Sequence, residues 1–134
     1  MKFNSQVCTT KEQSERLLAL GLKKETADMG IVKSTNEIYV GCPTDYSFEN
    51  SLHIPAWSLH RLIEMMPYDF IYNNNTYELQ ITCNGAGYDD REDRYPIVGW
   101  WRSNTYDDII DCIEWLIKAG YFNKEYLEGK DETI

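Results

Sequence analysis

The clearest hydrophobic pattern in the chain lies between Tyr95 and Gly120, where β-branched and aromatic residues pass directly into a helical repeat. The first part, residues 95–102, predicts a strand, since a proline is tolerated near the start of a strand. The second part predicts a helix that stops at Gly120. Its apolar face consists of Ile109, Ile110, Ile113, Leu116 and Ile117, and its charged face of Asp107, Asp111, Glu114 and Lys118.

Three more residues widen the apolar arc of this helix beyond the stripe that one sheet face needs, namely Cys112, Trp115 and Ala119. We therefore expect the helix to be covered on more than one side. A homodimer is the simplest arrangement that provides this cover, because symmetric dimers are the commonest oligomers. Cys112, Trp115 and Ala119 are accordingly the predicted oligomer interface.

Residues 1–53 predict one helix, one short strand and a long loop. Capping-box spacing occurs twice, as Thr9 with Glu12 and as Thr10 with Gln13, and the helix that follows ends near Gly21. The strand candidate is 37–41. Residues 42–53 are rich in turn-forming residues and have a length typical of functional or mobile loops. The expected core residues of the helix are Leu17, Leu18 and Leu22.

A second helix is predicted from Pro55 to Met66, because proline suits the first turn and another proline follows the end. Trp57, Arg61 and Met65 remain on its outer face. Trp and Arg often anchor protein interfaces and Met adapts to irregular partners, so these three residues form a predicted partner-binding patch. The alternative is that Trp57 packs under the loop of residues 42–53. The expected core residues of this helix are Ala56, Leu59, Leu62, Ile63 and Met66.

Residues 68–83 predict a β-hairpin, since two strand-like runs meet at Asn73 to Asn75 and asparagine tolerates the left-handed backbone of tight turns. Consecutive strands joined by short loops favour an antiparallel meander. The predicted fold is therefore α+β. It has an antiparallel sheet of three or four strands with helices packed on its faces, in a single domain that spans residues 1–134.

Charge and composition restrict the class of protein. The formal net charge of -9 argues against a nucleic-acid-binding surface, which needs clustered Lys and Arg, although an acidic mimic of DNA stays open. The first residues do not show the charged segment followed by an apolar run that is typical of a secretory leader, so we expect none, and no apolar segment approaches the ~20 residues that span a bilayer. We therefore expect a cytoplasmic protein that binds neither nucleic acid nor membrane.

Few residues point to chemistry. The four cysteines lie far apart and at no zinc spacing, so we expect free thiols, no metal and no cofactor. His60 precedes Glu64 by one helical turn, which fits a general base with its orienting carboxylate and also an ordinary surface pair. A small hydrolase that uses His60, Glu64 and a nearby thiol is the enzymatic alternative. Gly85 and Gly87 predict a turn rather than a dinucleotide site.

Four features follow one another between Ile54 and Glu128: a helix ending in LIEMMP, a tyrosine-rich hairpin, a tryptophan-containing strand and a helix ending in IEWLIKAGY. This succession resembles small uncharacterised proteins of phages, prophages and mobile elements of gut bacteria, some of which are similar to the phage α/β/α sandwich domain. The resemblance implies a cytoplasmic accessory role and brings no catalytic residues. We therefore expect a non-enzymatic module that works through contacts with a partner protein or with a second copy.

Overall fold

The computed structural model describes residues 5–41 and 52–129. Contacts divide the chain into two compact units, one within residues 1–62 and 124–134 and the other within 63–123. The described residues contain helices and antiparallel strands, which confirms the predicted α+β class. That the two units make up a single domain stays a prediction.

The first unit contains a three-stranded antiparallel sheet in the order β2-β1-β3. Its strands are β1 (Met29–Val32), β2 (Ile38–Val40) and β3 (His53–Ala56). Two short 3-10 helices also belong to this unit, η1 (Lys24–Thr26) and η3 (Lys124–Tyr126). A bridge between Leu22 and Leu127 ties the C-terminal segment to the end of the first helix region.

Helix α1 (Lys11–Ala19) packs on β3 and begins with a complete capping box. The Thr10 hydroxyl accepts from the Gln13 amide at 3.2 Å, and the Gln13 side chain accepts from the Thr10 amide at 2.9 Å. Of the two predicted boxes, the second is therefore the one that forms. Leu17 and Leu22 are buried as expected, whereas Leu18 is exposed.

The helix predicted from Pro55 to Met66 is shorter, because its first residues belong to a strand. Pro55 and Ala56 pair with β1 as part of β3, an edge strand in which proline is tolerated. Helix α2 (Leu59–Glu64) starts after Ser58, whose hydroxyl accepts from the Arg61 amide at 3.1 Å. Asp28 in turn accepts from the Ser58 amide and hydroxyl at 2.9 and 2.6 Å. A long-range contact thus sets the start of this helix.

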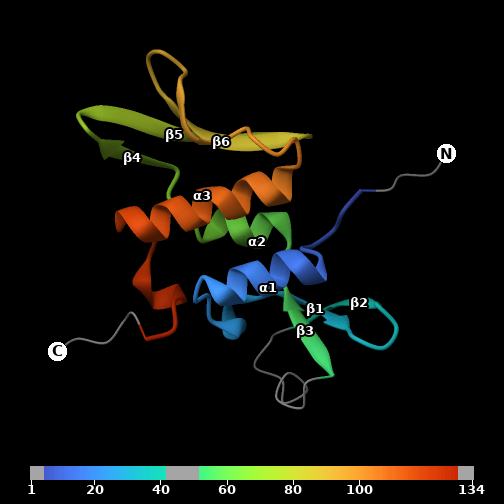
Figure 1. The fold of residues 1–134 in the computed structure, drawn as a ribbon. Coiled ribbons are helices and arrows are strands. Elements are labelled where there is room, and N and C mark those ends of the chain that lie inside the picture. The colour runs from blue at the N-terminus through green and yellow to red at the C-terminus, as the bar shows by residue number, and fades with distance from the viewer. Residues whose placement is uncertain (1–4, 42–51, 130–134) are drawn as a thin grey trace. The chain divides into compact units, whose positions relative to one another are not determined.

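The second unit contains the predicted meander, a four-stranded antiparallel sheet in the order β4-β5-β6-β7. The hairpin turn lies at Asn73 and Asn74, whose φ angles are 51° and 67°, as the sequence predicts. Figure 1 shows α3 running along one face of this sheet, where it contacts β6 and β7. The strands are β4 (Asp69–Tyr72), β5 (Asn75–Thr82), β6 (Gly85–Asp90) and β7 (Pro96–Gly99).

The turn predicted at Gly85 and Gly87 is wrong, because both glycines belong to β6 and are buried. The indole of Trp100 lies against them. A Cβ atom added at Gly85 would lie 3.0 Å from the Trp100 ring, and one added at Gly87 would clash with it. Glycine here allows a side chain to approach the strand closely, so it does not mark a turn.

Helix α3 (Thr105–Ala119) matches the predicted helix closely, because its boundaries depend on local signals. The Asn104 side chain caps its start by accepting from the Asp107 amide at 3.0 Å. Gly120 follows its end with a φ angle of 85°, in the left-handed region that favours glycine. The fully buried residues of α3 include Ile109, Ile110, Cys112, Ile113 and Leu116.

Candidate functional site

The predicted patch at Trp57, Arg61 and Met65 is wrong, because two of its three residues are buried. Trp57 is 0% exposed and donates from its indole nitrogen to the Thr26 hydroxyl at 2.9 Å. Met65 is 3% exposed, and the Arg61 Nε donates to the Thr26 carbonyl at 2.7 Å. The burial of Trp57 agrees with the alternative reading, but residues 42–51 of the loop proposed to cover it lie outside the described residues.

Only two of the three residues of the predicted oligomer interface are accessible. Cys112 is 0% exposed, so it is not available to a second copy. Trp115 is half-buried and Ala119 is exposed. Trp115 stacks on Phe70 and Tyr121, with ring centroids 5.3 and 6.1 Å apart. The homodimer itself stays a prediction.

The enzymatic alternative needs a reactive thiol, and the environment of two cysteines disfavours one. Burial raises the pKa of the Cys112 thiol, helped by the charge of Asp108, and burial also raises the pKa of Cys8. A raised pKa reduces the thiolate fraction that a nucleophile needs. His60 and Glu64 lie on α2 as expected and are both exposed. Among the described residues, no group of three or more His, Cys, Asp or Glu is placed to hold a metal ion.

A different feature stands out in the second unit, namely the connection between β7 and α3 at residues 99–103, which we call the tryptophan turn. Gly99, Trp100 and Ser103 have φ angles of 96°, 61° and 56°. Left-handed backbone is costly for a bulky residue such as tryptophan, and such strain persists only where the surroundings enforce it. The turn therefore needs strong contacts on both sides.

The carboxylate of Asp108 supplies the first of these contacts. It is 0% exposed and accepts hydrogen bonds from three backbone amides. Its Oδ2 accepts from Ala86 of β6 at 3.2 Å, and its Oδ1 accepts from Trp101 and Arg102 at 3.2 and 2.9 Å. One buried side chain on α3 thus fixes the turn against the neighbouring strand.

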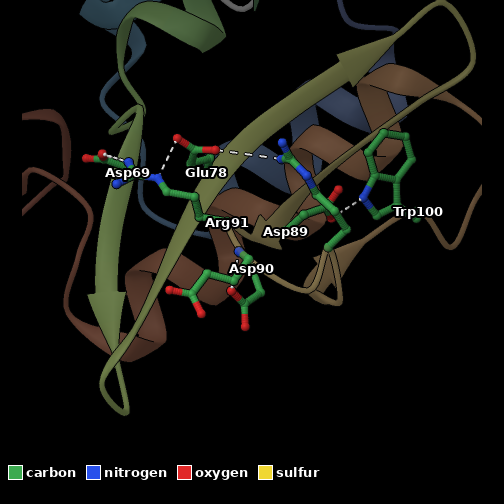
Figure 2. A network of polar contacts seen from close by, with 8 residues as sticks. Asp69, Glu78, Asp89, Asp90, Arg91 and Trp100 are labelled. Atoms are coloured by element: carbon green, nitrogen blue, oxygen red, sulfur yellow. Dashed lines mark hydrogen bonds and ion pairs between the residues drawn. The ribbon is translucent and has the colours of Figure 1, made fainter.

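The side chain of Trp100 supplies the second contact. Its indole nitrogen donates to Asp89 at 2.6 Å (Figure 2). The Trp100 ring also lies close to Gly85 and Gly87 of β6. On the same sheet, Arg91 donates to Glu78 and Asp69, both at 2.8 Å, and so joins the loop after β6 to β5 and β4. Trp100 therefore acts as a structural residue that anchors the turn.

The side chain of Trp101, in contrast to that of Trp100, does not anchor the turn, because it is 83% exposed. It borders a depression of about 350 Å³, which we call the tryptophan groove. The lining combines apolar and charged residues. The lining residues are Val98, Gly99, Trp101, Asp111, Glu114, Trp115 and Lys118.

Charges around the groove are paired but accessible. Arg102 donates to Asp111 at 2.8 Å and Lys118 to Glu114 at 2.9 Å. The second unit as a whole is acidic, because residues 63–123 contain eleven Asp and Glu against four Lys and Arg, a net charge of -7. Most of the formal charge of the whole chain, -9, therefore lies in the unit that carries the groove.

Sequence reasoning missed this site by treating 95–102 as one continuous strand. In a strand, two adjacent tryptophans point to opposite faces, so Trp100 and Trp101 cannot both be buried on one side. That pair was the available signal for an exposed aromatic residue. A larger depression, of about 430 Å³, lies beside residues 5–12. We place no site there, because the adjacent residues 1–4 lie outside the described range.

Comparisons of the chain with protein-family models, with curated proteins and with solved structures gave no match. In the described parts of the chain, none of the helices is both long enough and apolar enough to cross a membrane. The tryptophan turn and its groove are therefore interpreted from their own geometry.

We expect Gly99→Ala to lower the free energy of unfolding by about 2–3 kcal/mol, as measured by denaturant melts. The residue needs a left-handed backbone, and an added Cβ would clash with the Ala86 carbonyl oxygen and the Gly87 Cα. Gly120→Ala is the matched control. Its φ is also positive, at 85°, but nothing lies within 4 Å of an added Cβ. A loss of only about 1 kcal/mol is expected there, and equal losses in the two variants would contradict the role of close packing at Gly99.

Proposed function

We propose that this protein is a non-enzymatic interaction module that binds a partner protein through the tryptophan groove. The observation that carries the proposal is the 83% exposure of Trp101 on a backbone held by the buried Asp108 carboxylate. Tryptophan is among the residues that most often dominate binding energy at interfaces. An anchor whose backbone is already ordered loses little conformational entropy when a partner binds.

A phage or mobile-element accessory protein of the cytoplasm is the setting that we propose for this module. The resemblance of residues 54–128 to such proteins supports the phage or mobile-element origin. The free thiols of Cys8, Cys83 and Cys112 support the cytoplasmic location, because cysteines remain reduced in the cytosol.

Two other functions have less support. A hydrolase at His60 and Glu64 would need a thiolate, and burial raises the pKa of Cys8 and Cys112. A mimic of DNA would need free carboxylates in an array. Several carboxylates of the acidic unit are instead bound by arginines or by backbone amides, including Asp69, Glu78, Asp108 and Asp111.

A displayed library of random octapeptides, selected on the protein and counter-selected on Trp101→Ala, tests the proposal directly. We expect peptides that bind the parent at least tenfold more tightly than the variant, since a tryptophan anchor contributes about 2 kcal/mol or more. Trp101→Ala should keep its stability within about 0.5 kcal/mol, because the side chain is exposed.

The matched control is Tyr68→Ala, which removes another exposed aromatic residue, 66% exposed, next to β4 at the opposite edge of the sheet. Peptide affinity should be unchanged in this variant. Binding that falls equally in both variants, or a selection that yields no peptide sensitive to Trp101, would refute the tryptophan groove as the binding site.

A further inference from the structure

We propose that the partner segment is an extended, cationic peptide that lies along the free edge of β7 and ends in the tryptophan groove. This inference rests on the proposed function and adds the conformation and charge of the partner. Three features of the second unit support it: an edge strand, two exposed aromatic residues that bracket this strand, and an excess of acidic residues.

The edge strand is β7. Among the strands of residues 5–41 and 52–129, the order β4-β5-β6-β7 gives it a neighbour on one side only. An unpaired strand edge presents backbone donors and acceptors that an extended peptide can use, and peptide recognition by strand addition exploits this. The pairing of β7 with β6 is irregular between Tyr88 and Asp89. The strand nevertheless continues to Gly99, next to the groove.

Two exposed aromatic residues mark the ends of this edge. Tyr95, 74% exposed, immediately precedes β7, and Trp101, 83% exposed, follows it. A strand rises by about 3.3 Å per residue, so the four residues of β7 span roughly 13 Å. A peptide of six to eight residues in extended conformation is longer than this edge, so it can pair with β7 and also contact the exposed aromatic residues that flank the strand.

Charge determines which kind of peptide fits. The carboxylates of Asp111 and Glu114 lie in the groove. The exposed Glu92 and Asp93 before Tyr95 are balanced by Arg91 and Arg94, so the acidic end of the edge is the one at the groove. The Lys118 side chain that pairs with Glu114 is 74% exposed, and exposed pairs of this kind are weak, so a Lys or Arg of the peptide can replace it. Arginine and lysine also bind to the face of an exposed tryptophan.

A second copy of this chain fits the edge less well. Pairing β7 with another β7 would bring two units of net charge -7 together, with like charges near the contact. Like-charge juxtaposition opposes association. The charge of the unit thus favours a basic partner over a homodimer at this position.

The octapeptide selection described above also tests this inference through the composition of the peptides that depend on Trp101. We expect enrichment of Lys and Arg next to apolar residues. N-methylation of alternate backbone amides in the tightest peptide should weaken binding roughly tenfold when the methyl groups face β7, and should have little effect at the intervening positions.

The substitution Lys118→Glu should increase the affinity of the groove for cationic peptides. It adds a carboxylate to the groove, and we expect the affinity for cationic peptides to rise by roughly threefold to tenfold at low salt. The matched control is Lys118→Gln, which removes the same ammonium group without adding a carboxylate and should raise the affinity by a clearly smaller factor.

The outcomes separate this inference from the proposed function. Neutral or acidic peptides that depend on Trp101, or peptides insensitive to every N-methyl group, would overturn the inference and leave the interaction module standing. Self-association that Trp101→Ala abolishes, and with which the selected peptides do not compete, would identify a second copy as the occupant of the edge and would also overturn the inference. A selection without any Trp101-dependent peptide would overturn both.

Discussion

Asp108→Ala should lower the free energy of unfolding by about 3 kcal/mol or more. The substitution removes the acceptor of the buried Ala86 amide, which costs about 1–3 kcal/mol when left without a partner, and also that of the part-buried Trp101 and Arg102 amides. The effect should therefore exceed that of an ordinary surface carboxylate by a wide margin. Denaturant melts of the variant beside the parent measure it.

The neighbouring carboxylate provides the control, since Asp107→Ala also removes an acid from the first turn of α3. Asp107 is half-buried, and its loss should cost about 0.3–1 kcal/mol through the helix dipole. The free energy of unfolding of Asp108→Asn should lie between those of the parent and the alanine variant, because the side-chain amide keeps one acceptor oxygen. If Asp108→Ala and Asp107→Ala were equally stable, the buried carboxylate would not be what holds the tryptophan turn.

Trp57→Ala should destabilise the protein by about 3–5 kcal/mol, the usual cost of truncating a buried large aromatic residue. Trp57 is 0% exposed and its indole donates to the Thr26 hydroxyl, which would lose this donor and keep only its bond to the Lys23 carbonyl. The shape of the cavity left behind determines where in this range the loss falls. Equilibrium unfolding in urea, followed by circular dichroism, gives the value.

Trp101→Ala is the same chemical change at an exposed site, so the two variants form a matched pair. The exposed variant should change stability by about 0.5 kcal/mol or less. It should lose peptide binding, whereas Trp57→Ala at a temperature where it remains folded should retain it. A stable Trp57→Ala protein would contradict the burial of this residue and would restore the patch around Arg61 as a binding site.

Several elements could be predicted from the sequence because their signals are local. Helix α3 has an N-cap, a 3.6-residue repeat and a terminal glycine within 17 residues of each other, and the hairpin depends on adjacent asparagines. The antiparallel meander then follows from the short connections between consecutive strands. The fold class required no knowledge of distant contacts.

The candidate site could not be predicted in the same way, because distant residues build it. The helical pattern of residues 55–66 placed Trp57 on the outer face of the helix. In the structure Trp57 is buried, and its indole nitrogen donates a hydrogen bond to the Thr26 hydroxyl, 31 residues away in the sequence. The pattern of residues 95–102 suggested one strand. A carboxylate at Asp108 and two glycines of β6 instead turn the backbone so that Trp100 is anchored and Trp101 is exposed.

The sequence by itself therefore determined the ends of α3, the hairpin, the α+β class and the acidity of residues 63–123, since hydrogen bonds, periodicity and composition within a few residues specify them. The tertiary structure alone decided which tryptophans are buried and where α2 begins. These features depend on partners such as Asp28 for Ser58, 30 residues apart, and Asp108 for Ala86, 22 residues apart. A hydrophobic residue has no intrinsic preference for one packing partner over another, so only the packed chain determines which hydrophobic residues remain exposed.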